Sequence, residues 1–420
     1  MRSDRVTEFD PIKSQTMPVL LKAPKYRKRR MRHSFWLKPV VQSLQRCVFG
    51  RLKVVLPDQE IMYFGPPSNH QAAQIFVRDY AMFRRMALGG IIGLAESYMA
   101  GEWESPDLSA LFVFAIQNKA VLRGHMRGGQ VMRLINRAYH LVHANTRRGS
   151  RRNIAYHYDL GNAFYKHWLD SSMTYSSALY AQQDEALETA QDRKYARICT
   201  LAELKAGQSV LEIGCGWGSF ARTAVQKHGV DVTGLTLSRE QKSYAISQNK
   251  DIGDKAEFSL TDYRDATGQY DRIVSIEMFE AVGEENWGQY FHKLKQCLKP
   301  GGVAVLQVIS IDDEAFKTYR RSADFIQRYI FPGGLLPSKA ALSDAINEAG
   351  LILEYVENFG QSYAKTLAVW RESFVKAWPD IKAQGFDERF RRMWQFYLSY
   401  CEAGFLTGQT DVGFYKIRRR

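Results

Sequence analysis

Apolar and polar positions alternate in a clear pattern in the amino-terminal part of the chain. Two short apolar runs, 52–56 and 61–64, are separated by turn residues, which is typical of a β-hairpin. Apolar residues then recur with helical spacing from Asp107 to Gln117. A hairpin followed by a helix within so short a stretch predicts a small α+β domain, which we place at residues 36–117.

A different pattern begins near residue 195, where short apolar strands alternate with helical stretches. Strands separated by helices predict a doubly wound, mainly parallel sheet of the Rossmann-like kind. The fold class is therefore α/β, with this larger domain at residues 151–420 and the smaller α+β domain before it. We expect strands at 210–213, 230–235, 257–260, 270–276 and 303–309, and helices at 220–227, from 238, and between 286 and 298.

Basic residues are concentrated outside these two domains. The 420 residues include 58 Lys and Arg against 44 Asp and Glu, a formal charge of +14. Residues 1–35 form a basic arm that we expect to be disordered, and residues 118–150 form a basic linker without an acidic side chain. Such segments are typical of a solvated surface or of a site for a polyanion, and charge alone does not separate nucleic acid from an anionic membrane.

The cysteines and the apolar runs limit the class of protein. Five cysteines are scattered without a C-x-x-C pair, which is typical of reduced thiols and predicts neither a disulfide framework nor a metal site. No apolar run approaches the roughly 18 residues that a membrane-spanning helix needs, and no secretory signal is recognisable. We therefore expect a cytoplasmic protein.

A glycine-rich loop connects the strand at 210–213 to the next helix. It reads E-I-G-C-G-W-G from Glu212 to Gly218, and its glycines let a ligand approach the backbone at the carboxyl edge of the sheet. Glu212 is placed to accept a hydrogen bond from the amino group of a bound amino-acid moiety. Because the glycine spacing differs from the dinucleotide fingerprint, S-adenosylmethionine is favoured over NAD as the cofactor.

The second strand lacks the terminal acid that usually binds ribose hydroxyls. It ends near Thr236, and Ser238 and Gln241 follow with the spacing of a helix capping box. Thr236 and Gln241 are therefore candidates for ribose binding, while Ser238 and Gln241 are candidates for capping the helix. The two interpretations are compatible, and both stay open.

Several ordered motifs resemble those of the cyclopropane-fatty-acyl-phospholipid synthases and mycolic acid cyclopropane synthases. The resemblance extends from about residue 150 to residue 408, and residues 96–103 resemble the amino-terminal lipid-handling domain of the longer members. The larger domain is thereby identified as a methyltransferase domain. The motifs lie at 156–162, 169–176, 212–218, 234–238, 262–265, 278–283, 329–333 and 400–405.

The resemblance implies transfer of the methyl group of S-adenosylmethionine to a cis double bond in a phospholipid acyl chain. The alkene attacks the methyl group, and a base, a bound bicarbonate in that family, removes a proton from the resulting carbocation so that a cyclopropane ring closes. Such a cation requires an apolar site that excludes water and offers aromatic faces. Candidates for the aromatic wall are Tyr175, Phe279, Tyr329 and Tyr363.

The resemblance also assigns functional residues by motif. Cys401 matches a cysteine once regarded as a nucleophile, but methyl transfer to an alkene needs none, so we expect a structural or pocket-lining role. The bicarbonate cradle falls on Ser177, Glu280, Gln307, Ile309 and Tyr363. The cofactor positions fall on Tyr175, Ser176, Glu212, Gly214, Gly216, Gly218, Thr236, Leu237, Gln241, Asp262, Tyr263 and Ile276.

Two of these positions depart from the commonest pattern of the family, which often has Cys at Ser177 and His at Gln307. Ser and Gln can still donate hydrogen bonds to an anion. The loss of a titratable imidazole could nevertheless change how the cation is resolved. A cyclopropane is the default product, and proton loss from a neighbouring carbon would give a methyl-branched or methylene acyl chain as the alternative.

Two hypotheses of another class are less favoured. A nucleic-acid methyltransferase would need a D/N-P-P-Y/F loop or a Pro-Cys or Thr-Cys nucleophile, and the chain has neither. Glu280, Tyr363 and the glycine loop argue against a lipid-binding protein without activity. We therefore expect as partners an unsaturated phospholipid and an anionic membrane surface, with peripheral association at the inner face of the cell membrane through the basic segments. We expect no nucleic-acid partner, and the resemblance suggests a homodimer.

Overall fold

The computed structural model describes residues 35–67, 71–126, 149, 160–182, 184–321 and 324–420. The basic arm expected at residues 1–35, except for Phe35, and most of the basic linker expected at 118–150 lie outside the described residues. In the part of the chain that is described, no helix is both long enough and apolar enough to cross a membrane.

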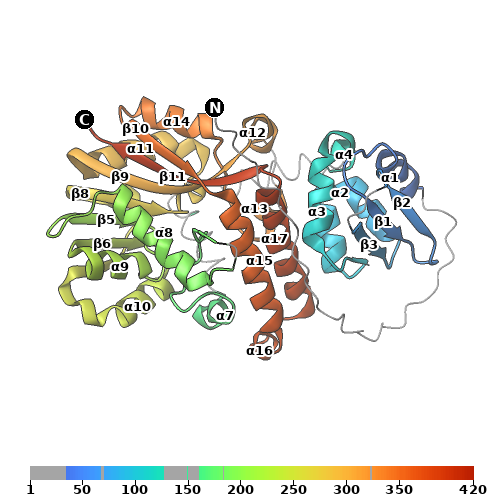
Figure 1. The fold of residues 1–420 in the computed structure, drawn as a ribbon, viewed down its shortest axis with the longest axis horizontal. Coiled ribbons are helices and arrows are strands. Elements are labelled where there is room, and N and C mark those ends of the chain that lie inside the picture. The colour runs from blue at the N-terminus through green and yellow to red at the C-terminus, as the bar shows by residue number, and fades with distance from the viewer. Residues whose placement is uncertain (1–34, 68–70, 127–148, 150–159, 183, 322–323) are drawn as a thin grey trace, which may run out of the picture.

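The amino-terminal part contains a four-stranded sheet packed against helices (Figure 1). The expected hairpin is confirmed, because β1 (Leu52–Val55) pairs antiparallel with β2 (Ile61–Phe64). The expected helix is confirmed as α3 (Leu108–Gln117), whose first turn is capped by the Asp107 carboxylate. The sheet order is β2-β1-β3-β4, and the other elements are β3 (Ala73–Val77), β4 (Trp103–Glu104), α1 (Leu37–Leu44), α2 (Ala81–Met99) and α4 (Lys119–Met126).

The predicted doubly wound sheet is confirmed, with seven strands in the order β10-β11-β9-β8-β5-β6-β7. All neighbouring pairs from β9 to β7 in this order are parallel. Two antiparallel strands at the other end, β10 and β11, were not expected. Since β10 is an edge strand with most side chains at least partly exposed, it has no apolar run to predict it. The bounds are β5 (Ser209–Ile213), β6 (Asp231–Thr236), β7 (Ala256–Leu260), β8 (Tyr270–Ile276), β9 (Leu298–Ile311), β10 (Ile352–Asn358) and β11 (Thr410–Arg418).

Helices cover both faces of this sheet. On β5, Val210 packs into the cluster that contains side chains of α8 and α9, while the next residue, Leu211, packs with α11 and α14 on the opposite face. The α-helices of this part are α7 (Asn162–Lys166), α8 (Leu187–Leu201), α9 (Ser219–His228), α10 (Arg239–Gln248), α11 (Trp287–Cys297), α12 (Asp313–Tyr319), α13 (Phe325–Tyr329), α14 (Lys339–Glu348), α15 (Gly360–Lys376), α16 (Trp378–Ala383) and α17 (Glu388–Leu406). Short 3-10 helices are η1 (Lys250–Lys255), η2 (Tyr263–Asp265), η3 (Phe279–Ala281) and η4 (Glu284–Asn286).

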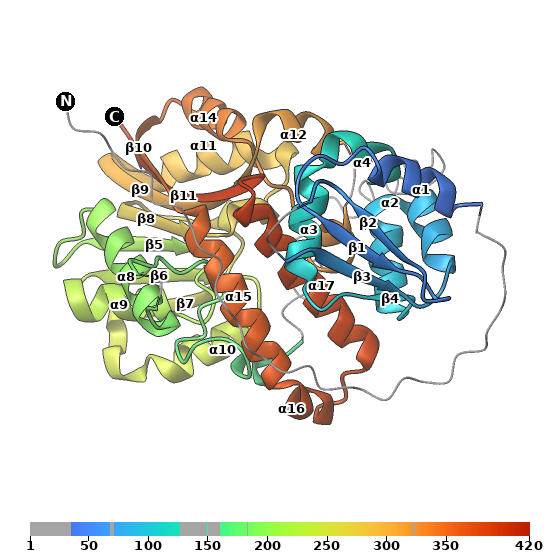
Figure 2. The same cartoon turned by 45° about the vertical axis from the view of Figure 1, so that its right-hand side comes forward.

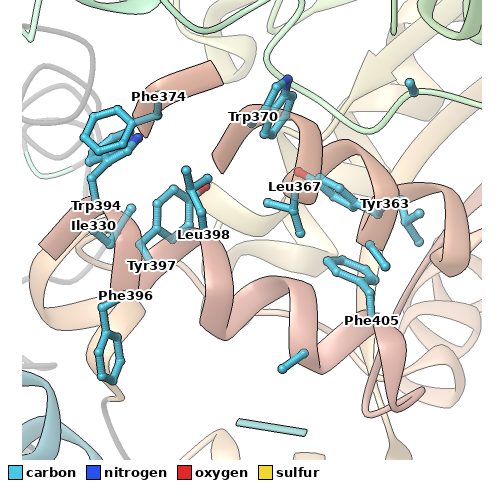
Figure 3. Packing of buried hydrophobic residues seen from close by; sticks show 14 of the residues in the cluster. Ile330, Tyr363, Leu367, Trp370, Phe374, Trp394, Phe396, Tyr397, Leu398 and Phe405 are labelled. Atoms are coloured by element: carbon cyan, nitrogen blue, oxygen red, sulfur yellow. The ribbon is translucent and has the colours of Figure 1, made fainter. Parts of the chain in front are cut away.

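Helices α15 and α17 stand between the large sheet and the amino-terminal part (Figures 1 and 2). Their aromatic side chains form a shared core (Figure 3). On the amino-terminal side, Phe396 packs edge-on against Phe112 with ring centroids 4.8 Å apart. Ser109 Oγ donates to Glu402 Oε2 at 2.7 Å, and Arg371 Nε donates to the same oxygen at 3.0 Å. The two parts are therefore joined by apolar packing and by a buried polar link.

Candidate active site

A cavity of about 870 Å³ opens at the carboxyl edge of the parallel strands, where ligands bind in open α/β sheets. Loops after β5, β6 and β8 form part of its wall, and α15, α17 and the start of α4 form other parts. The expected site residues that line it are Tyr175, Ser176, Glu212, Gly214, Gly216, Thr236, Leu237, Gln241, Tyr263, Ile276, Glu280, Ile309, Tyr363 and Cys401. The expected residues that are not part of the wall are Ser177, Gly218, Asp262 and Gln307.

The glycine loop runs along the cavity in a conformation that favours glycine. Gly214 and Gly216 line the cavity with φ of 85° and 52°. A Cβ at Gly214 would lie 2.8 Å from the side chain of Met278. Gly218, with φ of 89°, instead lies at the N-cap of α9, where a Cβ would meet the Asn249 amide at 2.7 Å. Gly214 and Gly216 thus face the ligand space, whereas Gly218 allows the loop to pack.

Glu212, at the end of β5, presents an incompletely paired carboxylate to the cavity. The side chain is buried, and its Oε2 has no hydrogen-bond partner among the described residues. Burial raises the pKa of this carboxyl to about 8. A buried acceptor without a partner is costly unless a ligand completes it. The position therefore fits a ligand that brings a cationic amino group, as S-adenosylmethionine does.

The helix after β6 has only one of the two hydrogen bonds of the expected capping box. Ser238 Oγ accepts from Gln241 N at 3.2 Å, so Ser238 is the N-cap of α10. The side chain of Gln241 does not return to Ser238, because it accepts from Thr236 Oγ1 at 2.8 Å. Thr236 and Gln241 both line the cavity, and their role in binding ribose stays a prediction.

The carboxylate of Asp262 forms an ion pair with Arg264, two residues further along the chain. This carboxylate accepts from Arg264 Nη2 at 2.7 Å and from Arg264 N at 3.0 Å, and both side chains are buried. The adjacent Tyr263 lines the cavity, and its hydroxyl oxygen is buried without a partner among the described residues. Of these expected cofactor positions, the structure therefore brings Tyr263 rather than Asp262 to the ligand space.

Glu277, which the sequence analysis did not single out, joins three residues of the expected bicarbonate cradle. It follows β8 directly, has φ of 49°, and lines the cavity. Its Oε1 accepts from Ser177 N at 2.8 Å and from Gln307 Nε2 at 2.6 Å, while its Oε2 accepts from Tyr363 OH at 2.6 Å. Donors expected to hold a free anion thus hold the carboxylate of Glu277.

One sequence signal could have indicated Glu277. The residue is an acid placed directly after an apolar strand that was correctly predicted, so it had to lie at the carboxyl edge where ligands bind. The motif resemblance instead assigns the nearby Glu280 to the bicarbonate cradle. The bicarbonate cradle stays a prediction, and in the structure three of its five members are hydrogen-bonded to Glu277.

Glu280 and Glu277 lie in different electrostatic environments. Glu280 Oε1 accepts from Ile309 N at 2.6 Å, and Oε2 has no partner among the described residues. Burial and the charge of Glu277 raise the pKa of Glu280 to about 8. Burial also raises the pKa of Glu277, but its three donors and the charge of Lys194 oppose this shift. The three donors and the charge of Lys194 therefore favour the charged form of Glu277, whereas Glu280 is mostly a neutral acid at neutral pH.

Lys194 on α8 is a second residue that the sequence analysis missed. It is fully buried, and its Nζ donates to Ser176 Oγ at 2.6 Å. Burial lowers its pKa, while the carboxylates of Glu277, Asp170 and Glu212 oppose that shift. Its positive charge in turn lowers the pKa of Glu212 and of Glu277. Lys194 thus connects the expected cofactor end of the cavity to the Glu277 end.

The expected aromatic wall is partly correct. Tyr175 and Tyr363 line the cavity, whereas Phe279 is buried in the core beside α11, and Tyr329 donates to Glu96 at 2.6 Å. Figure 3 shows Tyr363 on α15 beside Phe405 on α17, and their ring centroids are 4.5 Å apart. Other aromatic residues that line the cavity are Tyr195, Trp217, Phe220, Tyr263, Tyr319, Phe331, Tyr397, Tyr400 and Phe405. The wall around the reacting region is therefore apolar and rich in aromatic rings.

Cys401 lies on α17 and lines the cavity. Burial raises the pKa of its thiol, and the nearby Asp324 carboxylate raises it further. A thiol that is held protonated is a poor nucleophile. A lining role for Cys401 therefore stays our expectation.

Comparison with known sequences points in the same direction as the geometry. The sequence profile of the family described as mycolic acid cyclopropane synthetase matches residues 145–415. The tuberculostearic acid methyltransferase UfaA1 of Mycobacterium tuberculosis is 39% identical over 364 residues, which are 81% of this chain and 82% of that protein. The cyclopropane-fatty-acyl-phospholipid synthase of Escherichia coli K12 is 37% identical over 338 residues, covering 79% of this chain and 84% of the relative.

Solved structures of similar fold come from the same group. The cyclopropane synthase MmaA2 of Mycobacterium tuberculosis superimposes with a TM-score of 0.61 at 28% identity, covering 64% of this chain and 98% of that chain. The mycolic acid cyclopropane synthase CmaA1 complexed with SAH and CTAB gives a TM-score of 0.61 at 29% identity, with coverage of 64% and 98%.

Proposed function

Since this chain belongs to the mycolic acid cyclopropane synthetase family, we propose that it methylates a double bond in a phospholipid acyl chain and resolves the carbocation with Glu277. As a member of this family it is an S-adenosylmethionine-dependent C-methyltransferase that acts on lipid acyl chains. We further propose which residue is the base, which product forms, and that a membrane presents the lipid.

The loops after β5, β6 and β8 would hold the cofactor. When bound, S-adenosylmethionine supplies an electrophilic methyl group to the alkene. Glu212 would accept from the amino group through its unpaired Oε2, and Gly214 and Gly216 leave room for close approach to the backbone. Thr236 and Gln241 would contact the ribose. Ser176 lines the same wall, and its hydroxyl group accepts a hydrogen bond from Lys194, which would hold it in position to contact the cofactor.

The acyl chain would lie along the apolar wall of α15 and α17. Leu367, Tyr397 and Phe405 line this region, and their buried, largely apolar side chains would exclude water. Exclusion of water protects a carbocation from hydration, and aromatic faces stabilise its charge. These side chains therefore support an alkene as the reacting group.

The observation that carries the proposal is the Glu277 carboxylate in the expected place of bicarbonate. Three hydrogen bonds fix it, one each from Ser177, Gln307 and Tyr363. Its pKa is raised by burial, which makes it a stronger base than an exposed carboxylate. Glu277 is thus suited to take the proton that the cation must lose, with Glu280 beside it as a neutral acid.

We propose a methyl-branched or methylene chain that retains a double bond as the product. A carboxylate attached to the end of β8 has a fixed reach, unlike a free anion, so it selects the C–H bond that faces it. Proton loss that leaves the ring open yields the branched alkene. Gln307, which departs from the family pattern, donates to Glu277 through its side chain, whereas Ser177 does so through its backbone N, and UfaA1 is named a tuberculostearic acid methyltransferase.

A cyclopropane is the second candidate product. It requires Glu277 to remove the proton from the newly added methyl group while the ring closes. Its support is the name of the Escherichia coli relative and those of the similar structures. In either case we propose that the substrate is presented by an anionic membrane, which the basic segments at 1–35 and 118–150 would contact.

Product analysis tests the base and the product together. Purified protein is incubated with S-adenosylmethionine and vesicles of cis-monounsaturated phospholipid, in buffer freed of bicarbonate or supplemented with it. We expect the acyl chain to gain the mass of a CH2 unit, to remain cleavable by ozone, and to form at a rate independent of bicarbonate. Ozone-resistant product would favour the cyclopropane, dependence on bicarbonate would remove Glu277 as the base, and no mass gain would overturn the proposed substrate.

A further inference from the structure

Two basic side chains line the same cavity as the carboxylates of Glu277 and Glu280. Lys119 and Arg123 lie one turn apart on α4, on the same face of the helix, and both line the wall with Ile116 and Ala120. Both basic side chains are exposed to solvent. In both views α4 stands next to α12, across the side of the molecule where the two parts meet (Figure 2).

Among the described residues, no acid forms an ion pair with Lys119 or Arg123. The chain around them, residues 118–150, has no Asp or Glu. Two unpaired cations in the wall of a largely apolar cavity match a ligand with an apolar body and a single anionic group.

We propose that Lys119 and Arg123 bind the phosphate of the lipid head group while the acyl chain occupies the cavity. This inference rests on the proposed function and names the part of the substrate that this wall recognises. An Arg guanidinium can donate two parallel hydrogen bonds to phosphate, and a Lys adds a compact charge beside it. Ala120 between them is small, and Ile116 extends the apolar surface toward Tyr400.

The acids in the wall argue against a polyanion at this place. Asp312 and Glu314 line the same cavity, on the side of α12, so the potential there is not uniformly positive. A nucleic acid lying along this wall would meet repulsion from these carboxylates. A single phosphodiester, reached by Lys119 and Arg123 alone, would not.

The test separates recognition of the phosphate from general attraction to a charged membrane. The variant K119Q/R123Q is compared with K38Q/R46Q, which removes the same charge from exposed side chains of the amino-terminal part that do not line the cavity. Monounsaturated phosphatidylglycerol, or diacylglycerol with the same acyl chains, is presented in neutral detergent micelles. Binding of S-adenosylmethionine is measured by calorimetry to establish that each variant is folded.

We expect K119Q/R123Q to raise the KM for the phospholipid about tenfold, since two charge-assisted hydrogen bonds are lost. The KM for diacylglycerol should not change, and K119R/R123K should restore most of the loss. An equal rise for both lipids, an equal rise in K38Q/R46Q, or no rise would overturn the phosphate site. Failure of the unmodified protein to methylate either lipid would instead overturn the proposed function, which keeps the two failures distinct.

Discussion

Glu277→Gln is expected to lower kcat roughly 10²- to 10⁴-fold, the range that a general base contributes. The amide has nearly the same shape, and its single oxygen can still accept from Ser177 N and Gln307 Nε2 while its NH2 group donates to Tyr363 OH, but it cannot take a proton. Because Glu212 and the glycine loop are unchanged, the dissociation constant for S-adenosylmethionine should stay within about threefold in calorimetry. Single-turnover assays with a monounsaturated phospholipid measure the chemical step directly.

A glycine at the same position gives a sharper control. Glycine adopts the φ of 49° without strain, so Glu277→Gly should remove the carboxylate without disturbing the backbone. Ser177 N, Gln307 Nε2 and Tyr363 OH would then be free to hold an added anion. We expect bicarbonate to rescue turnover of Glu277→Gly but not that of Glu277→Gln, whose amide fills the space. Near-normal turnover of either variant without bicarbonate would exclude Glu277 as the base.

Local sequence patterns were sufficient to predict the strand, loop and acid that line the cofactor end of the cavity. The glycine loop was predicted from the glycine spacing after an apolar strand, and the loop lies at the carboxyl edge of β5 as the topology requires. Glu212 was predicted from the same local pattern, because its position at the strand end determines where the side chain lies. Contacts between residues close in sequence, such as the capping of α10 by Ser238, could also be predicted.

Local patterns could place Glu277 at the carboxyl edge of the sheet but could not predict its hydrogen-bond donors, because these come from distant parts of the chain. Ser177 precedes Glu277 by 100 residues, Gln307 follows it by 30 and Tyr363 by 86. No periodicity in the sequence relates these positions, and a donor expected to serve a ligand is indistinguishable in sequence from one that serves a side chain. The same limit applied to Asp262, whose carboxylate is occupied by Arg264.

Lys194 was missed for a different physical reason. A lysine on a helix next to charged residues is usually a solvated side chain, and the pattern of α8 alone does not place it inward. Its burial becomes visible only when Ser176, Glu212 and Glu277 are packed around it. A buried cation among carboxylates is costly to desolvate, and such an arrangement is most often found where it adjusts the charge of functional groups.

Lys194→Met is therefore expected to disturb both ends of the cavity at once. The positive charge of Lys194 lowers the pKa of Glu277 and of Glu212, so its removal should raise both further. A base must be ionised to act, and raising its pKa moves the rising limb of the pH profile of kcat to higher pH. We expect a displacement of about one to two units, with a fall in kcat of roughly 10- to 100-fold at neutral pH that is partly recovered at alkaline pH. Binding of S-adenosylmethionine should weaken, because a still higher pKa makes Glu212 harder to ionise opposite the cationic amino group.

A neighbouring substitution separates this charge effect from loss of packing. Tyr195→Phe removes the hydroxyl that contacts Thr174 Oγ1 at 2.8 Å on the same buried stretch of α8, but leaves the charge of Lys194 in place. Its pH profile should therefore keep the limb of the unmodified enzyme, even if its thermal stability falls. A limb that stays in place in Lys194→Met, or that moves equally in Tyr195→Phe, would show that the charge of Lys194 does not determine the ionisation of Glu277. Only a displacement specific to the lysine variant is consistent with Lys194 keeping Glu277 ionised as a base inside an apolar cavity.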